Sequence, residues 1–158
     1  MLWMRTLVLA LGLVVIANVS AQDKKDEKKP LDPAKLVGKW SITEGMKGGE
    51  KVGDDAKKGV IEFTKDKISL KSMDAEFEFS YKVDAKASPA SIDMEILKPE
   101  GFKGTKAMGI IKIEDGKATL CYHPMGGDRP KKFESTKDDG NYMFTMKAAK
   151  EEKKEEKK

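Results

Sequence analysis

The chain has 158 residues, with 31 Lys or Arg and 27 Asp or Glu, so its net charge is +4. This small, evenly mixed excess and an aromatic content of 7% argue against a nucleic-acid-binding surface, which needs a basic stripe interleaved with aromatic residues. The single cysteine, Cys121, excludes an internal disulfide. The length suits one domain, and the charges gather at both ends, so the middle can bury a core.

Residues 1–21 are typical of a secretory signal peptide. Arg5 precedes an aliphatic run from Leu7 to Ile16, and Val19-Ser20-Ala21 offers small residues for cleavage. The run is short for a membrane span, and an uncleaved anchor is the alternative. Both readings predict export, to the periplasm or the medium. Residues 22–31 form a charged leader and residues 148–158 a charged tail, both too polar to bury a core, and we predict disorder for both.

The first predicted elements of the domain are a helical turn and a strand. Asp32 can cap a turn that runs to Leu36, with Pro33 at its first position. A strand follows from Gly38 to Glu44, in which Trp40 and Ile42 share one face. Gly45–Gly59 is rich in glycine and predicts a long surface loop with one helical turn near residues 54–58.

Seven further strands are expected, near residues 60–64, 67–71, 75–83, 92–96, 105–114, 118–122 and 141–147, and an eighth over 131–136. The clearest alternation places Phe77, Phe79, Tyr81 and Val83 on one face. In the 105–114 strand the apolar residues change parity beside Gly109, which predicts a β-bulge there. Asp115-Gly116 predicts a two-residue hairpin.

About nine short strands joined mostly by hairpins predict an all-β, antiparallel fold, either a sandwich or a barrel. Closing the sheet removes its two exposed edges. We therefore predict a barrel of about eight or nine strands over residues 32–147, in which Trp40 fills one end.

A family resemblance supports this prediction. Gly38-Lys39-Trp40 on a first strand resembles the start of lipocalin-like barrels. Together with Ile61-Glu62-Phe63, Gly109-Ile110-Ile111, Leu120-Cys121-Tyr122 and Arg129-Pro130 with Phe133, it resembles a planctomycete-type exported domain of unknown function. The resemblance implies a calycin-type barrel with structural roles for Gly38, Trp40 and Arg129, and implies no particular reaction. It also implies a cation over Trp40, a part that falls to Lys147 or Arg129 here.

The predicted barrel interior is the candidate binding site. An eight-stranded barrel is just wide enough to be filled by side chains or to hold one small ligand. Its candidate lining is Trp40, Phe77, Phe79, Tyr81, Met94, Met108, Tyr122 and Phe144. Two hypotheses follow: a module that binds a small apolar or amphipathic molecule, or a structural or protein-interaction module of the cell envelope with a filled core.

The sequence offers no catalytic constellation. His123 is the only histidine, and it has no partner at metal-ligand or triad spacing. We expect no enzymatic activity, no cofactor, no metal and a monomer, with membrane attachment only through an uncleaved signal. Cys121 is interpreted as a small buried apolar residue, with a reactive or intermolecular thiol as the alternative. Arg129 is expected to pair with a carboxylate or to stack on Trp40.

Overall fold

The structure is a computed structural model that describes residues 30–71 and 76–149. The predicted signal peptide, the leader before Pro30 and the tail from residue 150 lie outside these residues. Two 3-10 turns, one short helix and nine strands are present: η1 Pro33–Leu36, β1 Gly38–Lys47, β2 Glu50–Lys51, α1 Asp54–Lys57, β3 Val60–Phe63, β4 Lys67–Lys71, β5 Glu76–Asp84, β6 Ser91–Lys98, η2 Glu100–Phe102, β7 Lys106–Glu114, β8 Lys117–His123 and β9 Tyr142–Ala148. Within the described residues, no helix has the length and apolar character needed to cross a membrane.

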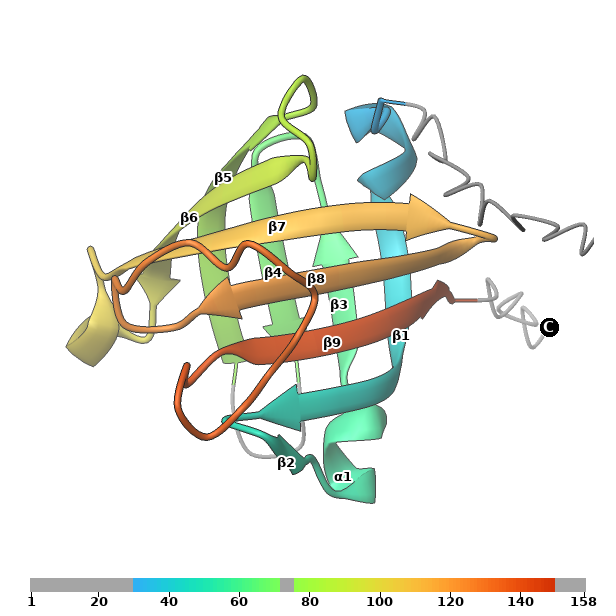
Figure 1. Ribbon diagram of the computed structural model, residues 1–158. Helices are drawn as coiled ribbons and strands as arrows, with labels where there is room; N and C mark the ends of the chain where they lie inside the picture. Colours follow the sequence, from blue (N-terminus) through green and yellow to red (C-terminus); the bar gives the residue numbers. More distant parts are fainter. Residues whose placement is uncertain (1–29, 72–75, 150–158) are drawn as a thin grey trace, which may run out of the picture.

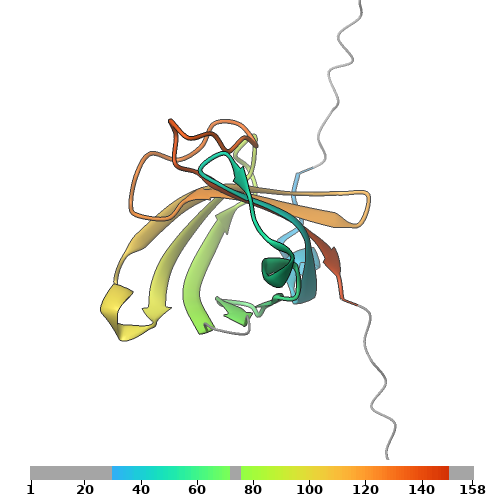
Figure 2. The same cartoon turned by 90° about the horizontal axis from the view of Figure 1, so that it is seen from below.

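The strands form one antiparallel sheet that closes on itself. Eight of them, β1 and β3 to β9, follow one another round the barrel, and β1 then pairs with β9. Figure 2 shows the strands curving into this wall. The predicted all-β closed barrel is therefore confirmed, with the two-residue β2 as an extra strand beside β1.

Strand β1 closes the barrel by pairing with both β3 and β9. Its first residues, Gly38–Ser41, pair with β3, while Trp40–Lys47 pair with β9. A register shift between Ile42 and Glu44 bends β1, so that Ile42 and Gly45 are both buried.

The barrel interior is a continuous apolar core. Alternation along each strand places one set of side chains inside, such as Ile92, Met94 and Ile96 of β6. Its members include Trp40, Phe63, Ile68, Phe79, Met94, Ile111, Leu120, Phe144 and Met146. Trp40 is 5% exposed, and its indole N–H donates to the carbonyl of Leu36 at 2.7 Å, which ties η1 to the core.

Local structure closes both ends of the barrel. η1 lies at one end, capped by the Asp32 carboxylate, which accepts from the Ala34 N–H at 3.0 Å, as the sequence predicts. β2 and α1 lie at the other end (Figure 1). There Val52 packs so closely over Gly45 that a Cβ on Gly45 would stand 2.6 Å from it. The expectation of a long loop over 45–59 is therefore wrong, although its helical turn is confirmed.

Two strand predictions are corrected. Residues 131–136 form no strand, because β8 pairs directly with β9 and no free edge is left beside it. β7 has no bulge at Gly109, since its register with β6 and β8 is unbroken. The parity change arises because Ile111 faces the interior, whereas Ile110 is buried on the outer face beneath the 124–141 segment. Figure 2 shows this segment outside the wall.

We predict that Trp40→Ala lowers the free energy of unfolding by about 3–5 kcal/mol, because it leaves a large cavity at the η1 end. Trp40→Phe, which keeps a ring but leaves the buried Leu36 carbonyl without its donor, should cost about 1–3 kcal/mol. Urea unfolding followed by far-ultraviolet circular dichroism measures both. An unchanged midpoint in Trp40→Ala would contradict a core role for this residue.

Candidate functional site

The barrel interior leaves almost no free space. Its cavity measures about 30 Å³ and is lined by apolar side chains of β1, β3 to β6, β8 and β9, among them Phe79, Met94 and Leu120. That volume holds about two water molecules at most. A small-molecule site needs roughly 300 Å³ or more, so the interior as it stands is a packed core.

The structure brings most of the predicted interior residues together. Trp40, Phe79, Met94 and Phe144 are buried in the core, and Phe77, Tyr81 and Tyr122 pack against it half-buried. Met108 is misplaced by the prediction. It is 37% exposed and points outward between Asp93 and His123 of the neighbouring strands, because the inward positions of β7 are Ala107, Gly109 and Ile111.

The absence of a side chain at Gly109 leaves the space that the Tyr122 side chain needs. The two residues are cross-strand partners, and a Cβ on Gly109 would lie 2.8 Å from the Tyr122 Cβ. Tyr122 also meets Tyr142 edge-on, with ring centroids 5.7 Å apart. Burial and the neighbouring Tyr142 both raise the pKa of the Tyr122 phenol. The neutral ring therefore contributes to the core through its packing contacts.

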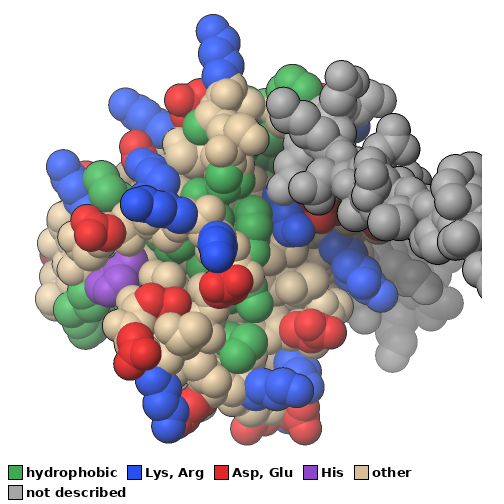
Figure 3. Space-filling model, in the orientation of Figure 1, with side chains coloured by type: hydrophobic (Ala, Val, Ile, Leu, Met, Phe, Trp, Pro, Cys, Tyr) green, Lys and Arg blue, Asp and Glu red, His purple; other side chains and the backbone are tan. Residues whose placement is uncertain are grey.

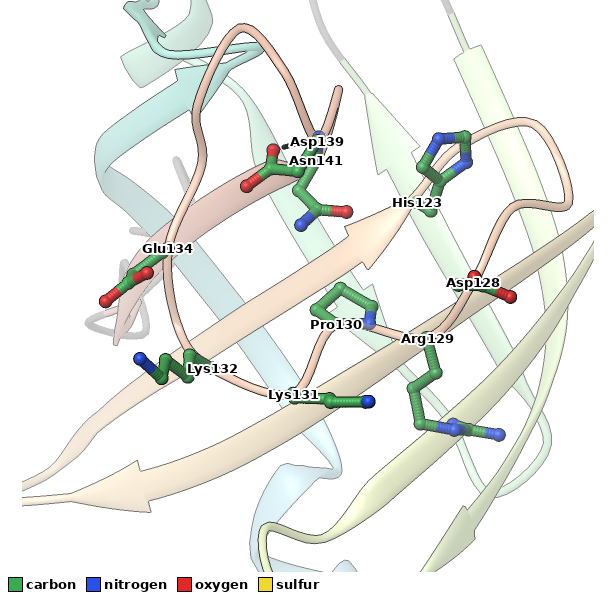
Figure 4. A pocket seen from close by; sticks show the side chains of 9 residues that line it. All are labelled: His123, Asp128, Arg129, Pro130, Lys131, Lys132, Glu134, Asp139 and Asn141. Atoms are coloured by element: carbon green, nitrogen blue, oxygen red, sulfur yellow. Dashed lines mark hydrogen bonds between the residues drawn. The ribbon is translucent and has the colours of Figure 1, made fainter.

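The first of two hollows large enough for a ligand lies on the outside of the barrel. It measures about 510 Å³ and is lined by residues of the 124–141 segment together with His123 at the end of β8 (Figure 4). Its lining has equal numbers of basic and acidic side chains, with His123 and Asn141 between them: Arg129, Lys131 and Lys132 against Asp128, Glu134 and Asp139. Such a mixed set gives no single preference for an anion or a cation.

Arg129 fastens the 124–141 segment to the barrel. Its guanidinium donates to the carbonyls of Ile92 at 3.2 Å and Gly109 at 2.7 Å, and it pairs with the Asp93 carboxylate. The expected pairing with a carboxylate is confirmed, and stacking on Trp40 is wrong. Lys147 does not lie over the Trp40 ring either. In the described residues the cation–π contacts are those of Lys47 with Tyr142 and of Lys112 with Phe133.

The side chains of His123 and Asp139 accept hydrogen bonds from backbone N–H groups of nearby turns. His123 Nδ1 accepts from the Gly127 N–H at 3.1 Å and from the Met125 N–H at 3.4 Å, so its lone pair is already engaged within the turn. Burial would raise the pKa of Asp139, but hydrogen bonds from the Asn141 and Thr136 N–H groups outweigh it and lower that pKa. No cluster of three or more His, Cys, Asp or Glu placed to hold a metal occurs in residues 30–71 and 76–149.

Cys121 lies buried under the same segment. Its outward-facing thiol donates to the carbonyl of Glu134 at 3.2 Å, and burial raises its pKa to about 11. Both facts oppose thiolate formation at neutral pH.

The second hollow lies at the η1 end of the barrel. It measures about 590 Å³ and is bounded by residues 30–35, by the loop between β5 and β6, by the end of β7 and by Phe133. Figure 3 shows hydrophobic side chains exposed below the β5–β6 loop, in this region. Sequence reasoning missed this hollow because it joins four segments that are distant in the chain. The only local signal was the Ser88-Pro89 break between two strands.

The fold and these sites define a closed eight-stranded antiparallel barrel with a packed interior and two hollows on its outside. No protein-family model matches the chain, and no curated protein matches it. An uncharacterized protein from Bacteroides eggerthii, solved by crystallography, is similar in structure: it aligns over 71% of this chain and 98% of its own, with a TM-score of 0.44 and 15% identity.

We predict that Arg129→Ala loosens the 124–141 segment and exposes Cys121. Losing the charged hydrogen bonds of Arg129 should favour local opening, so the thiol should react with 5,5′-dithiobis(2-nitrobenzoate) about tenfold faster or more.

Lys132→Ala is the matched control, because this exposed lysine of the same segment has no ion pair within the described residues. Urea midpoints separate local opening from global unfolding. Equal reaction rates in wild type and Arg129→Ala would show that Arg129 does not hold the segment down.

Proposed function

We propose that the protein is an exported, non-enzymatic binding module that works through its outer surface around a filled barrel. The observation that carries this proposal is the interior cavity of about 30 Å³, set against outer hollows of about 510 and 590 Å³. A binding partner, whether a small molecule or an envelope protein, then meets loops and strand ends, and the barrel interior serves stability.

The use of the polar groups supports a non-enzymatic role. The groups best suited to chemistry already serve structure: His123 accepts from two backbone N–H groups, Arg129 fastens the 124–141 segment, and the Cys121 thiol is buried. Each would have to give up a structural contact to act on a substrate.

Export rests on the sequence of residues 1–21, and the proposed lipocalin-like character rests on Gly38-Lys39-Trp40 at the start of the first strand. The charged segments on either side of the domain suit a protein that is held in solution after cleavage. The monomer is part of the same proposal, since closure of the sheet leaves no long edge for a second chain.

The filled barrel is tested with an engineered cavity. Leu120 is 4% exposed and lines the small interior space. Leu120→Ala should lower the free energy of unfolding by about 2–5 kcal/mol and create a dry apolar cavity that takes up benzene.

Saturating benzene should therefore raise the melting temperature of Leu120→Ala and leave that of the wild type unchanged, as measured by differential scanning calorimetry. Lys51→Ala, on the exposed β2 strand, is the control for effects of benzene on the solvent. A rise in the wild type as large as in the variant would mean that the interior already accepts ligands, which is the rival hypothesis.

Export is tested with the complete chain, expressed in a bacterial host that has a periplasm. We expect the protein in the periplasmic fraction with a mass that corresponds to residues 22–158. Leu13→Arg, which interrupts the apolar run, should keep the uncleaved chain in the cytoplasm. Full-length mass in the membrane fraction would instead indicate an uncleaved anchor.

A further inference from the structure

The hollow at the η1 end has an apolar floor built from the inside of the barrel. Ala90 is 8% exposed and Ile111 is fully buried, and the Ile111 N–H donates to the Ala90 carbonyl at 2.9 Å. Ile113, Leu31 and Phe133 continue this surface and are only half-buried. The core thus reaches the surface at this end, in a hollow whose 590 Å³ lies within the usual range for small-ligand sites.

Three lysines and two carboxylates line the same hollow, and both carboxylates are engaged. Asp32 caps η1 by accepting from the Ala34 N–H, and Glu114 pairs with Lys112 at 2.7 Å. Lys112 in turn lies 4.9 Å from the centre of the Phe133 ring. Within the described residues, Lys35 and Lys86 form no ion pair. The lining therefore has one more positive than negative charge, and two of its ammonium groups are free to bind an anionic group.

An apolar floor beneath unpaired cations favours one kind of occupant. An apolar chain or ring gains by covering Ile113 and Phe133, and one negative charge at its end can accept charge-assisted hydrogen bonds from the lysines. A neutral apolar molecule would gain only the first of these terms. A cation would face repulsion at the rim.

We propose that this hollow binds a free amphipathic carboxylate, an apolar chain that ends in one carboxylate group, with its tail on Ile113 and Phe133 and its charge between Lys35 and Lys86. This site rests on the proposed outer-surface function and gives that function a ligand class.

The test uses the purified chain and decanoate below its micellar concentration, with isothermal titration calorimetry for affinity and amide and methyl NMR for location. Decanoate should bind and shift the signals of Ala87 and Ile113 but not those of Met94 and Leu120. Decanol, which has the same chain without the charge, should bind about tenfold more weakly or worse.

Two variants examine the charge and the space separately. The double change Lys35→Glu and Lys86→Glu should weaken decanoate about tenfold and leave decanol unaffected, whereas Lys51→Glu with Lys106→Glu, at the opposite end of the barrel, should change neither. Ala87→Trp, in the β5–β6 loop, should fill the hollow and abolish binding, and its unchanged barrel signals would show that it folds.

The possible failures are distinguishable. Equal affinity for decanoate and decanol, or an unaffected double variant, overturns the ligand class. No binding of decanoate at all overturns the site but leaves the filled barrel intact. Binding that shifts Met94 and Leu120 overturns both this site and the outer-surface function.

Discussion

The structure depends on the double pairing of β1, which joins the first strand of the sheet to the last. Ser41 illustrates it, since the residue has Val60 of β3 as partner on one side and Lys147 of β9 on the other. Strands β4 to β8 each pair with their two neighbours in the chain, and such a meander would have two open edges if β1 did not also pair with β9. Closure also sets the size of the interior. An eight-stranded barrel has room only for its own side chains or one small ligand, and here the aromatic residues and methionines fill that room.

Trp40 links this closure to the outer sites. It stands on β1 where the pairing changes, and its indole N–H binds the carbonyl of Leu36 at the end of η1. The position of η1, and with it one wall of the hollow at that end, is therefore fixed by a buried hydrogen bond within the core. The outer hollow under the 124–141 segment is held in a comparable way by Arg129. In both places the barrel supplies the rigid surface and loops supply the walls, an arrangement common in proteins that bind through loops.

The alternation of apolar residues was enough to predict the barrel, because strands such as β5 and β6 have one buried and one hydrated face. The same alternation gave a wrong prediction for β7, because this strand has buried residues on both faces. Ile111 faces the core, and Ile110 lies under the 124–141 segment. Apolar residues on both faces of a strand leave no clear parity, which explains the wrong prediction of a bulge at Gly109 and the wrong inward placement of Met108. The strand prediction over residues 131–136 was wrong for a different reason: this covering segment alternates in exposure although it pairs with no strand of the described chain. The hollows could not be predicted, because they depend on loop packing between segments far apart in the sequence.

Because the interior is filled, any ligand specificity of this barrel would have to come from residues on its outside. A barrel that binds inside selects ligands by cavity shape, and each enlargement of the cavity costs packing energy of about 2–5 kcal/mol for a change as large as Leu to Ala. In the proposed outer-surface function this conflict does not arise, because Lys35, Lys86 and the exposed residues of the β5–β6 loop lie outside the core. Arg129 is an outer residue that cannot be replaced so freely, because its guanidinium donates to carbonyls of β6 and β7 and thereby holds the 124–141 segment. If the η1 hollow binds the ligand class proposed above, it is the part of this fold where ligand preference can change most freely while the barrel remains intact.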